Sequence, residues 1–234
     1  MSADGSVPQA LVRKFDPALL QARWVLGGLE PEELISEALL ALEQGFPGNA
    51  LQQIAGLVKP TVADLDNLPE RVFAELGLKP IDKEAAVDLL MARGGLTENR
   101  IIHSLLADFP ALSNRWRTYI EEWGGQHIGD YIDMAEVVHF VVEDLYEKGN
   151  LDEVRRIFDY MEKQLQDCDQ ETRDLIGLGF FETLQNVASH TVDGYRVYEK
   201  FLGRISKRIW KEIQRAWEGK SSLAEVVRAE RSRG

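Results

Sequence analysis

One segment of this 234-residue chain carries side chains that could bind a metal ion. Glu136 and His139 are three residues apart and Glu143 follows one turn later, so a helix would place all three on one face. Di-iron sites in four-helix bundles use two Glu-x-x-His pairs of this spacing and two further carboxylates. The chain has no second such pair, and its other histidines are His103, His127 and His190. We therefore expect no metal or other cofactor, and interpret His139 as a half-buried, hydrogen-bonded side chain.

The single cysteine, Cys168, is the other reactive group in the sequence. It lies in the polar run 164–169 without a neighbouring histidine or cation that would activate its thiol, and it has no partner for an internal disulfide. The sequence also contains no Gly-x-Ser-x-Gly elbow and no Gly-rich phosphate-binding loop ending in Lys-Ser/Thr. These observations indicate that the protein is not an enzyme.

The elements that would position these side chains are helices. Apolar residues recur at three- and four-residue steps, which predicts long helices over 130–148, 151–167, 170–190 and 194–217 and a last one from Ser222. Two stripes should be buried against each other across the turn at 148–150: Ile132, Ala135, Val138, Val142 and Leu145 on one helix, and Val154, Ile157, Met161 and Leu165 on the next. Gly177 and Gly179 predict either a close helix approach or a kink.

The N-terminal half predicts shorter helices that begin at capping signals. Expected starts are Asp16-Pro17, Pro31 and Asp82, and Thr61 with Asp64 resembles a capping box for a helix over 62–76. With no strand pattern, the fold class is all-α, either stacked antiparallel helical hairpins of the HEAT type or an irregular helical bundle. We divide the chain into a flexible N-terminus (1–9), an N-terminal helical region (10–95) and a C-terminal helical stack (96–234).

Charge is unevenly distributed along the chain. The net charge is −12, yet residues 195–234 hold eleven Lys/Arg against five Glu, which leaves −18 for the rest. An acidic surface attracts a cationic partner and repels nucleic acid. The basic C-terminal segment could instead bind nucleic acid, but its apolar residues follow helical steps, so Trp210 and Trp217 are expected to pack. No apolar run is long enough for a signal peptide or a membrane span, and we expect a cytoplasmic protein.

Several segments between Leu105 and Trp217 carry a family resemblance: LLADFPALSNRW, EEWGG, the 131–165 helix pair, DLIGLGFFETLQN and YEKFLGRISKRIWKEIQRAWEG. Their order resembles a group of uncharacterised bacterial helical domains. The resemblance implies an immunity protein of an interbacterial toxin system, and it offers no catalytic residues to carry over. It covers about half of the chain and leaves the N-terminal region without a guide.

Immunity function would fit the charge, because an acidic protein can block the basic cleft of a toxin that cuts nucleic acid. We predict that the partner-binding residues are acidic side chains with two tyrosine anchors: Asp130, Tyr131, Asp133, Glu136, Glu143, Asp144, Tyr146 and Glu147. The partner would be another protein such as a basic toxin domain, and no small-molecule ligand is predicted. The alternatives are a HEAT-like scaffold or regulatory adaptor and, less favoured, a metal-dependent enzyme built on Glu136, His139 and Glu143.

Overall fold

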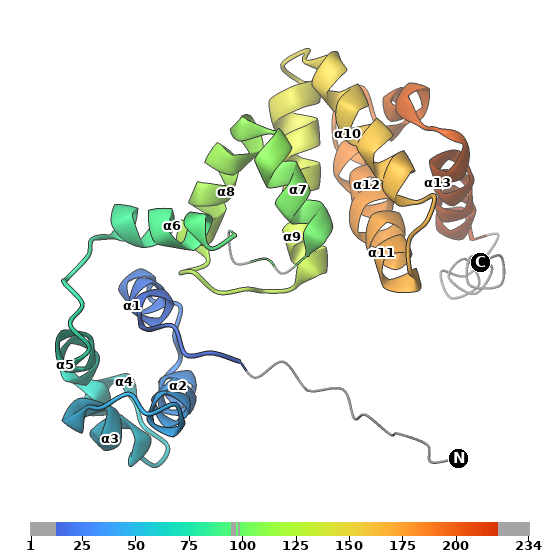
Figure 1. Cartoon of the computed structure of the whole chain (residues 1–234). Helices are drawn as coiled ribbons and strands as arrows, with labels where there is room; N and C mark the ends of the chain where they lie inside the picture. The colour runs from blue at the N-terminus through green and yellow to red at the C-terminus, as the bar shows by residue number, and fades with distance from the viewer. Residues whose placement is uncertain (1–12, 95–96, 98, 220–234) are drawn as a thin grey trace, which may run out of the picture. The chain divides into compact units, whose positions relative to one another are not determined.

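A computed structural model describes residues 13–94, 97 and 99–219 of the chain (Figure 1). Within these residues every regular element is a helix and there is no strand, so the predicted all-α fold is confirmed. None of the described helices combines the length and apolar character needed to cross a membrane. The predicted helix from Ser222 lies outside the described residues.

The chain forms two compact units. Unit 1 contains the described residues of 1–96 together with Ile120–Gln126, and unit 2 contains Thr97–Tyr119 and the residues from His127 onward. The C-terminal stack predicted over 96–234 includes residues 120–126, whereas in the structure these residues belong to unit 1.

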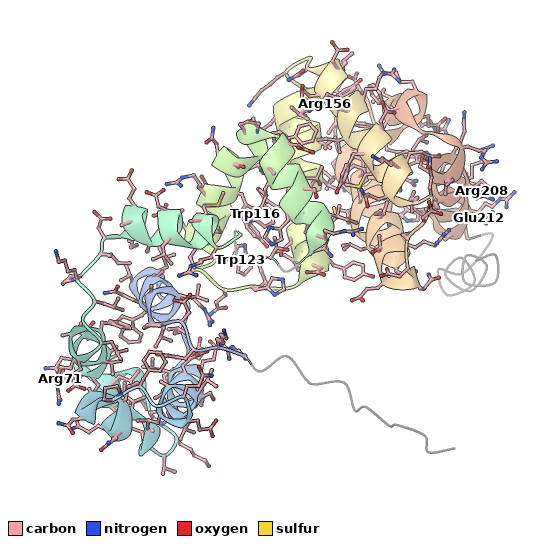
Figure 2. All side chains as sticks on the ribbon, viewed as in Figure 1. Arg71, Trp116, Trp123, Arg156, Arg208 and Glu212 are labelled. Atoms are coloured by element: carbon pink, nitrogen blue, oxygen red, sulfur yellow. The ribbon has the colours of Figure 1, made fainter. Side chains whose placement is uncertain are left out.

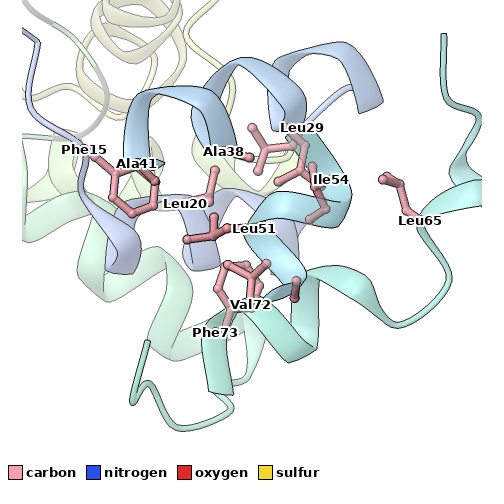
Figure 3. Close-up of a cluster of buried hydrophobic side chains, with 12 residues drawn as sticks. Phe15, Leu20, Leu29, Ala38, Ala41, Leu51, Ile54, Leu65, Val72 and Phe73 are labelled. Carbon is pink, nitrogen blue, oxygen red and sulfur yellow. The ribbon is translucent and has the colours of Figure 1, made fainter. Parts of the chain in front are cut away.

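Unit 1 is a small bundle built from helices that start where the capping residues predict. Asp16 accepts hydrogen bonds from the backbone N–H groups of Ala18 and Leu19, both at 3.1 Å, and Pro17 occupies the first turn. The bundle buries an apolar cluster that includes Leu51 and Phe73 (Figure 3). Its helices are α1 (Pro17–Leu26), α2 (Pro31–Glu43), α3 (Asn49–Ala55), α4 (Val62–Leu65), α5 (Leu68–Glu75) and α6 (Lys83–Ala92).

The single helix predicted over 62–76 is wrong, because the segment forms α4 and α5 with a break between them. The capping box at the start is present, and the Thr61 N–H donates to Asp64 Oδ2 at 2.7 Å. The break falls at Asp66, whose φ of +42° lies outside the helical region. Pro69 is in the first turn of α5, where its missing N–H costs nothing, whereas inside a continuous helix it would clash with the carbonyl of Leu65.

Unit 2 contains the longer helices. The predicted turn at 148–150 joins the segment ending at Tyr146 to the helix beginning at Leu151. In this turn Gly149 has a φ of +76°, and the Asn150 N–H donates to the Leu145 carbonyl at 2.8 Å. Two segments of this unit are π-helices (η1 and η2) and one is a 3₁₀-helix (η3). The elements are α7 (Arg100–Asp108), α8 (Pro110–Glu122, ending in unit 1), α9 (Asp130–His139), η1 (Phe140–Tyr146), α10 (Leu151–Gln164), α11 (Gln170–Asp174), η2 (Leu175–Glu182), α12 (Thr183–Ser189), η3 (Tyr195–Phe201) and α13 (Arg204–Trp217).

The predicted apolar stripe of α10 is fully buried, and in the stripe of α9 and η1 the residues Val138, Val142 and Leu145 are buried as predicted. Ile132 is 49% exposed, whereas Met134, Val137 and Val141 are fully buried. The buried face of this segment is therefore wider than the predicted stripe, and the prediction is wrong at Ile132.

Gly179 allows η2 to approach α9 closely. A Cβ atom at this position would lie 3.0 Å from Leu175 Cδ1 and 3.3 Å from Met134 Cγ, whereas one at Gly177 would have an ordinary contact of 3.6 Å with Ile209. Of the two roles predicted for these glycines, a close helix approach accounts for Gly179. The aromatic core of unit 2 lies beside it, with Phe158 and Phe180 5.7 Å apart between ring centroids.

The helix predicted over 194–217 is wrong in its first part. Residues 195–201 form the 3₁₀-helix η3, Leu202 is extended, and α13 begins at Arg204. The start of α13 is held by a side chain of α10: the Glu162 carboxylate accepts the Ile205 N–H at 2.7 Å and the Ser206 N–H at 2.9 Å. Burial opposes ionisation of Glu162, but these hydrogen bonds outweigh it and lower the pKa of its carboxyl group.

We expect Glu162→Gln to reduce the free energy of unfolding by about 1 kcal/mol at pH 7, because an amide is a weaker acceptor for two N–H groups at a helix start. A lowered folded-state pKa means that the carboxylate stabilises the fold fully above its unfolded pKa of about 4.3. That contribution is lost as the pH falls through the lower folded-state value. Urea unfolding of both proteins at neutral and acidic pH measures the difference.

Glu153→Gln is the matched control, since Glu153 lies on the same helix and pairs with Arg156 three residues later instead of capping a helix. Such a surface pair contributes a few tenths of a kcal/mol at most. Equal losses of stability in the two variants at pH 7 would contradict the assigned capping role of Glu162.

Candidate functional site

Three of the six acidic residues predicted to bind a partner surround one arginine of α8, Arg115. Arg115 Nη1 donates to Glu143 Oε2 at 3.0 Å and to Asp144 Oδ2 at 2.8 Å, and Arg115 Nε donates to Glu136. The Arg115 side chain is 26% exposed, so this network is partly shielded from water. Three predicted surface charges are therefore compensated within unit 2.

Two carboxyl groups in this network, those of Asp144 and Glu143, have pKa values below their usual range. Burial opposes ionisation of Asp144, but hydrogen bonds from Lys148 and Arg115 outweigh it and lower the pKa of this group. The pKa of Glu143 is also lowered, because hydrogen bonds from His139 and Arg115 outweigh the effect of burial. The Arg115 guanidinium supplies the positive charge that a metal ion would have brought to Glu136 and Glu143.

His139 is paired rather than placed in a cavity. Its Nδ1 lies 2.8 Å from Glu143 Oε1, one helical turn away, and its side chain is 39% exposed. The hydrogen-bonded histidine expected from the sequence is thus the arrangement found. The metal-dependent alternative would require Glu143 to give up its contacts with both His139 and Arg115.

Asp133 lies inside unit 2 rather than on its surface. The residue is 2% exposed, and its Oδ1 accepts the Tyr119 hydroxyl at 2.6 Å. Burial raises the pKa of Asp133, while the Tyr119 hydrogen bond and the nearby His127 act in the opposite direction. Burial and the same hydrogen bond also raise the pKa of the Tyr119 phenol. Asp133 therefore contributes no surface to partner binding in this structure.

Tyr131 is the predicted anchor that remains accessible. Its side chain is 49% exposed, as is that of Ile132 beside it. Burial of its inner part, and then the negative charges of Asp174, Glu171 and Asp130, raise the pKa of the Tyr131 phenol. We call the surface formed by Asp130, Tyr131, Ile132, Glu171 and Asp174 the Tyr131 patch. Sequence reasoning missed the two α11 carboxylates because they lie forty residues further along the chain.

Tyr146, the second predicted anchor, is engaged within unit 2. Its ring lies 4.7 Å from the buried ring of Tyr198, its hydroxyl is 3.4 Å from Asp193 Oδ2, and Lys200 Nζ lies 5.8 Å from its centroid. Glu147 beside it is exposed. A partner could contact the rim of this region, but the Tyr146 ring itself is already packed.

The packing of unit 2 shows where the two tryptophans of α13 and the single cysteine lie. Trp210 is buried at 1% exposure as expected, whereas Trp217 is 49% exposed, and basic residues such as Arg208 project from α13 (Figure 2). Cys168 is half-buried, and burial raises the pKa of its thiol, which makes the reactive thiolate less abundant. Neither feature forms a catalytic arrangement with its neighbours.

Unit 1 contains a cavity of about 250 Å³ with mostly apolar walls, formed by α1, α5 and the segment after α5. Its polar edge is a hydrogen bond from Trp24 Nε1 to Glu70 Oε1 at 3.0 Å. No nucleophile or histidine lines it. The cavity lacks the convergent polar groups that a catalytic pocket needs.

The fold and these side chains define an all-helical protein whose described polar groups are engaged mainly in ion pairs and helix caps. The chain belongs to the family described as Domain of unknown function (DUF7674), whose model matches residues 102–218. This interval runs from α7 to the residue after α13, and it confirms the resemblance to an uncharacterised domain family. Comparisons with the curated proteins and with the solved structures find no match.

We expect Arg115→Met to lower the free energy of unfolding of the protein by about 2 kcal/mol, between the values for exposed and buried ion pairs. The reason is that Glu136, Glu143 and Asp144 would face one another without the cation that joins them. Chemical denaturation at pH 7 measures the loss.

Arg208→Met removes the same charge from an exposed position on α13 and serves as the control. Adding Glu136→Gln to Arg115→Met should cost less than the sum of the two single losses, since the contact they share is already gone. Strict additivity in this cycle would mean that the network is not energetically coupled.

Proposed function

We propose that unit 2 binds a basic partner protein through the Tyr131 patch and acts by binding, without catalysing a reaction. The observation that carries the proposal is a half-exposed tyrosine flanked by three carboxylates from two helices. An aromatic ring beside negative charge is a favourable place for an arginine or lysine side chain, because the cation is attracted both to the ring face and to the carboxylates.

The other predicted partner-binding residues should contribute less to binding than the Tyr131 patch. Glu136, Glu143 and Asp144 are shared with Arg115, so part of their charge is already compensated within unit 2 and a partner would gain less from them. Exposed Glu147 would mainly affect the rate of association, as charges at the rim of an interface do. The main loss of affinity should therefore come from changes at Tyr131 and its neighbours on α11.

An immunity-type inhibitor is the form of this function that we favour. A toxin that cleaves nucleic acid presents a basic cleft, and a protein with a net charge of −12 can block such a cleft with long-range electrostatic attraction. The bacterial cytoplasm would be the place where that protection is needed. In this view the partner is a basic toxin domain, and the complex weakens as salt screens the charges.

The test is a quantitative pull-down from native lysate with the full-length protein and the double variant Tyr131→Ala/Glu171→Lys. We expect the wild type to retain one basic protein that salt releases, with at least tenfold less retained by the variant, since central anchors cost more than 1 kcal/mol when truncated. The retained protein is then assayed for nuclease activity with and without the bound wild type.

Asp159→Lys is the control for charge reversal, because Asp159 is an exposed carboxylate of α10 outside the Tyr131 patch. Retention of the partner by Tyr131→Ala/Glu171→Lys at the wild-type level would refute the patch. A retained partner whose activity is unchanged by binding would refute the inhibitor role, and several unrelated partners would favour a scaffold.

A further inference from the structure

A histidine and two aspartates converge at the start of α9. His127 Nε2 lies 3.2 Å from Asp133 Oδ2 and 3.4 Å from Asp130 Oδ1. Among the described residues, these three form the one group of histidine, cysteine and carboxylate side chains whose ligand atoms all lie within 4.8 Å of one another. The sequence did not predict this group, because His127 lies in the segment before α9, and helical spacing therefore does not indicate that it contacts Asp133.

Each aspartate has one oxygen directed to His127 and the other held by a neighbouring side chain. Asn99 Nδ2 donates to Asp130 Oδ2 at 3.0 Å, and the Tyr119 hydroxyl donates to Asp133 Oδ1 at 2.6 Å. Carboxylates that ligate metals are commonly oriented in this way, with outer hydrogen bonds fixing the oxygen that does not face the ion. The oxygens left over are those that converge with His127 Nε2.

The Asp133 oxygen at this point is an unusual buried group. Asp133 is 2% exposed, yet its Oδ2 receives no hydrogen bond within the described structure. A buried carboxylate oxygen without a donor is costly, and native proteins normally provide such an atom with a partner. Asp133 Oδ2 is aimed into the cluster, where a bound cation would satisfy it.

We propose that His127, Asp130 and Asp133 bind one divalent transition-metal ion, with Zn²⁺ as the best-suited probe. Nitrogen and oxygen ligands lie about 2.1 Å from Zn²⁺, which places tetrahedral ligand atoms about 3.4 Å apart, close to the two separations at His127 Nε2. Imidazole with carboxylates is a ligand set that such ions accept. Three protein ligands leave further positions for water.

An ion could reach this site from solvent, and its binding would hold neighbouring segments together. The side chains of His127 and Asp130 are 38% and 31% exposed, so an ion can enter from solvent without unfolding the helix. Binding would fasten the turn before α9 to the helix and, through Asn99, to the start of α7. The competing arrangement is a contact of His127 with the two aspartates alone, without any metal.

The experiment is calorimetric titration of Zn²⁺ into full-length protein that has been stripped with a chelator. We expect one equivalent to bind to the wild type, with at least a tenfold weaker affinity for His127→Ala and for Asp133→Asn. His139→Ala is the matched control, since His139 also contacts a carboxylate but lies outside the cluster, and its affinity should equal that of the wild type.

A second readout uses Co²⁺ in place of Zn²⁺, because its visible absorption reports coordination by protein ligands and does not depend on heat signals. His127 is an exposed side chain, so its alanine variant should remain folded even where Asp133→Asn does not. Absence of stoichiometric Zn²⁺ binding to the wild type, or equal affinities for wild type and His127→Ala, would overturn the proposal and leave an ion-paired cluster only.

Discussion

The packing of α9 against η2 is the constraint on which the rest of unit 2 depends. Met134, Val137 and Val138 are fully buried on this side of α9, and Gly179 removes the one Cβ that would hold the two helices apart. Because Met134, Val137 and Val138 fix one face of α9 in the core, Tyr131 on another face points toward solvent. The buried Asp133, the exposed Tyr131 and the carboxylates that meet Arg115 all follow from that orientation.

An acidic protein must also limit repulsion between its own carboxylates, and in unit 2 a single arginine does so for three of them. Arg115 serves three carboxylates at once, which is possible because a guanidinium offers several donors in a fixed plane. Glu162 is used differently: its charge stabilises the exposed N–H groups at the start of α13. The acidic surface that remains for a partner is therefore smaller than the net charge of −12 suggests.

Sequence reasoning recovered what depends on local signals and failed where distant residues decide. The all-α class, the Asp16 cap and the buried stripe of α10 follow from residue spacing alone. The break before α13 depends on Glu162, which is more than forty residues away, and the exposure of Ile132 depends on which face of α9 packs against η2. The same limit applies to the site, since the carboxylates beside Tyr131 and the donors to Asp133 come from other helices.

The two proposals for unit 2 share Asp130, and this links them energetically. A divalent ion held by His127, Asp130 and Asp133 would cancel negative charge at the edge of the Tyr131 patch, so a cationic partner would be attracted less strongly. Linkage is reciprocal, which means that the bound partner would weaken metal binding by the same factor. Under these two proposals, partner affinity would have a defined value only at a stated metal concentration. A chelator in the binding buffer would then change the apparent affinity through Asp130, even though it leaves Tyr131 and α11 untouched.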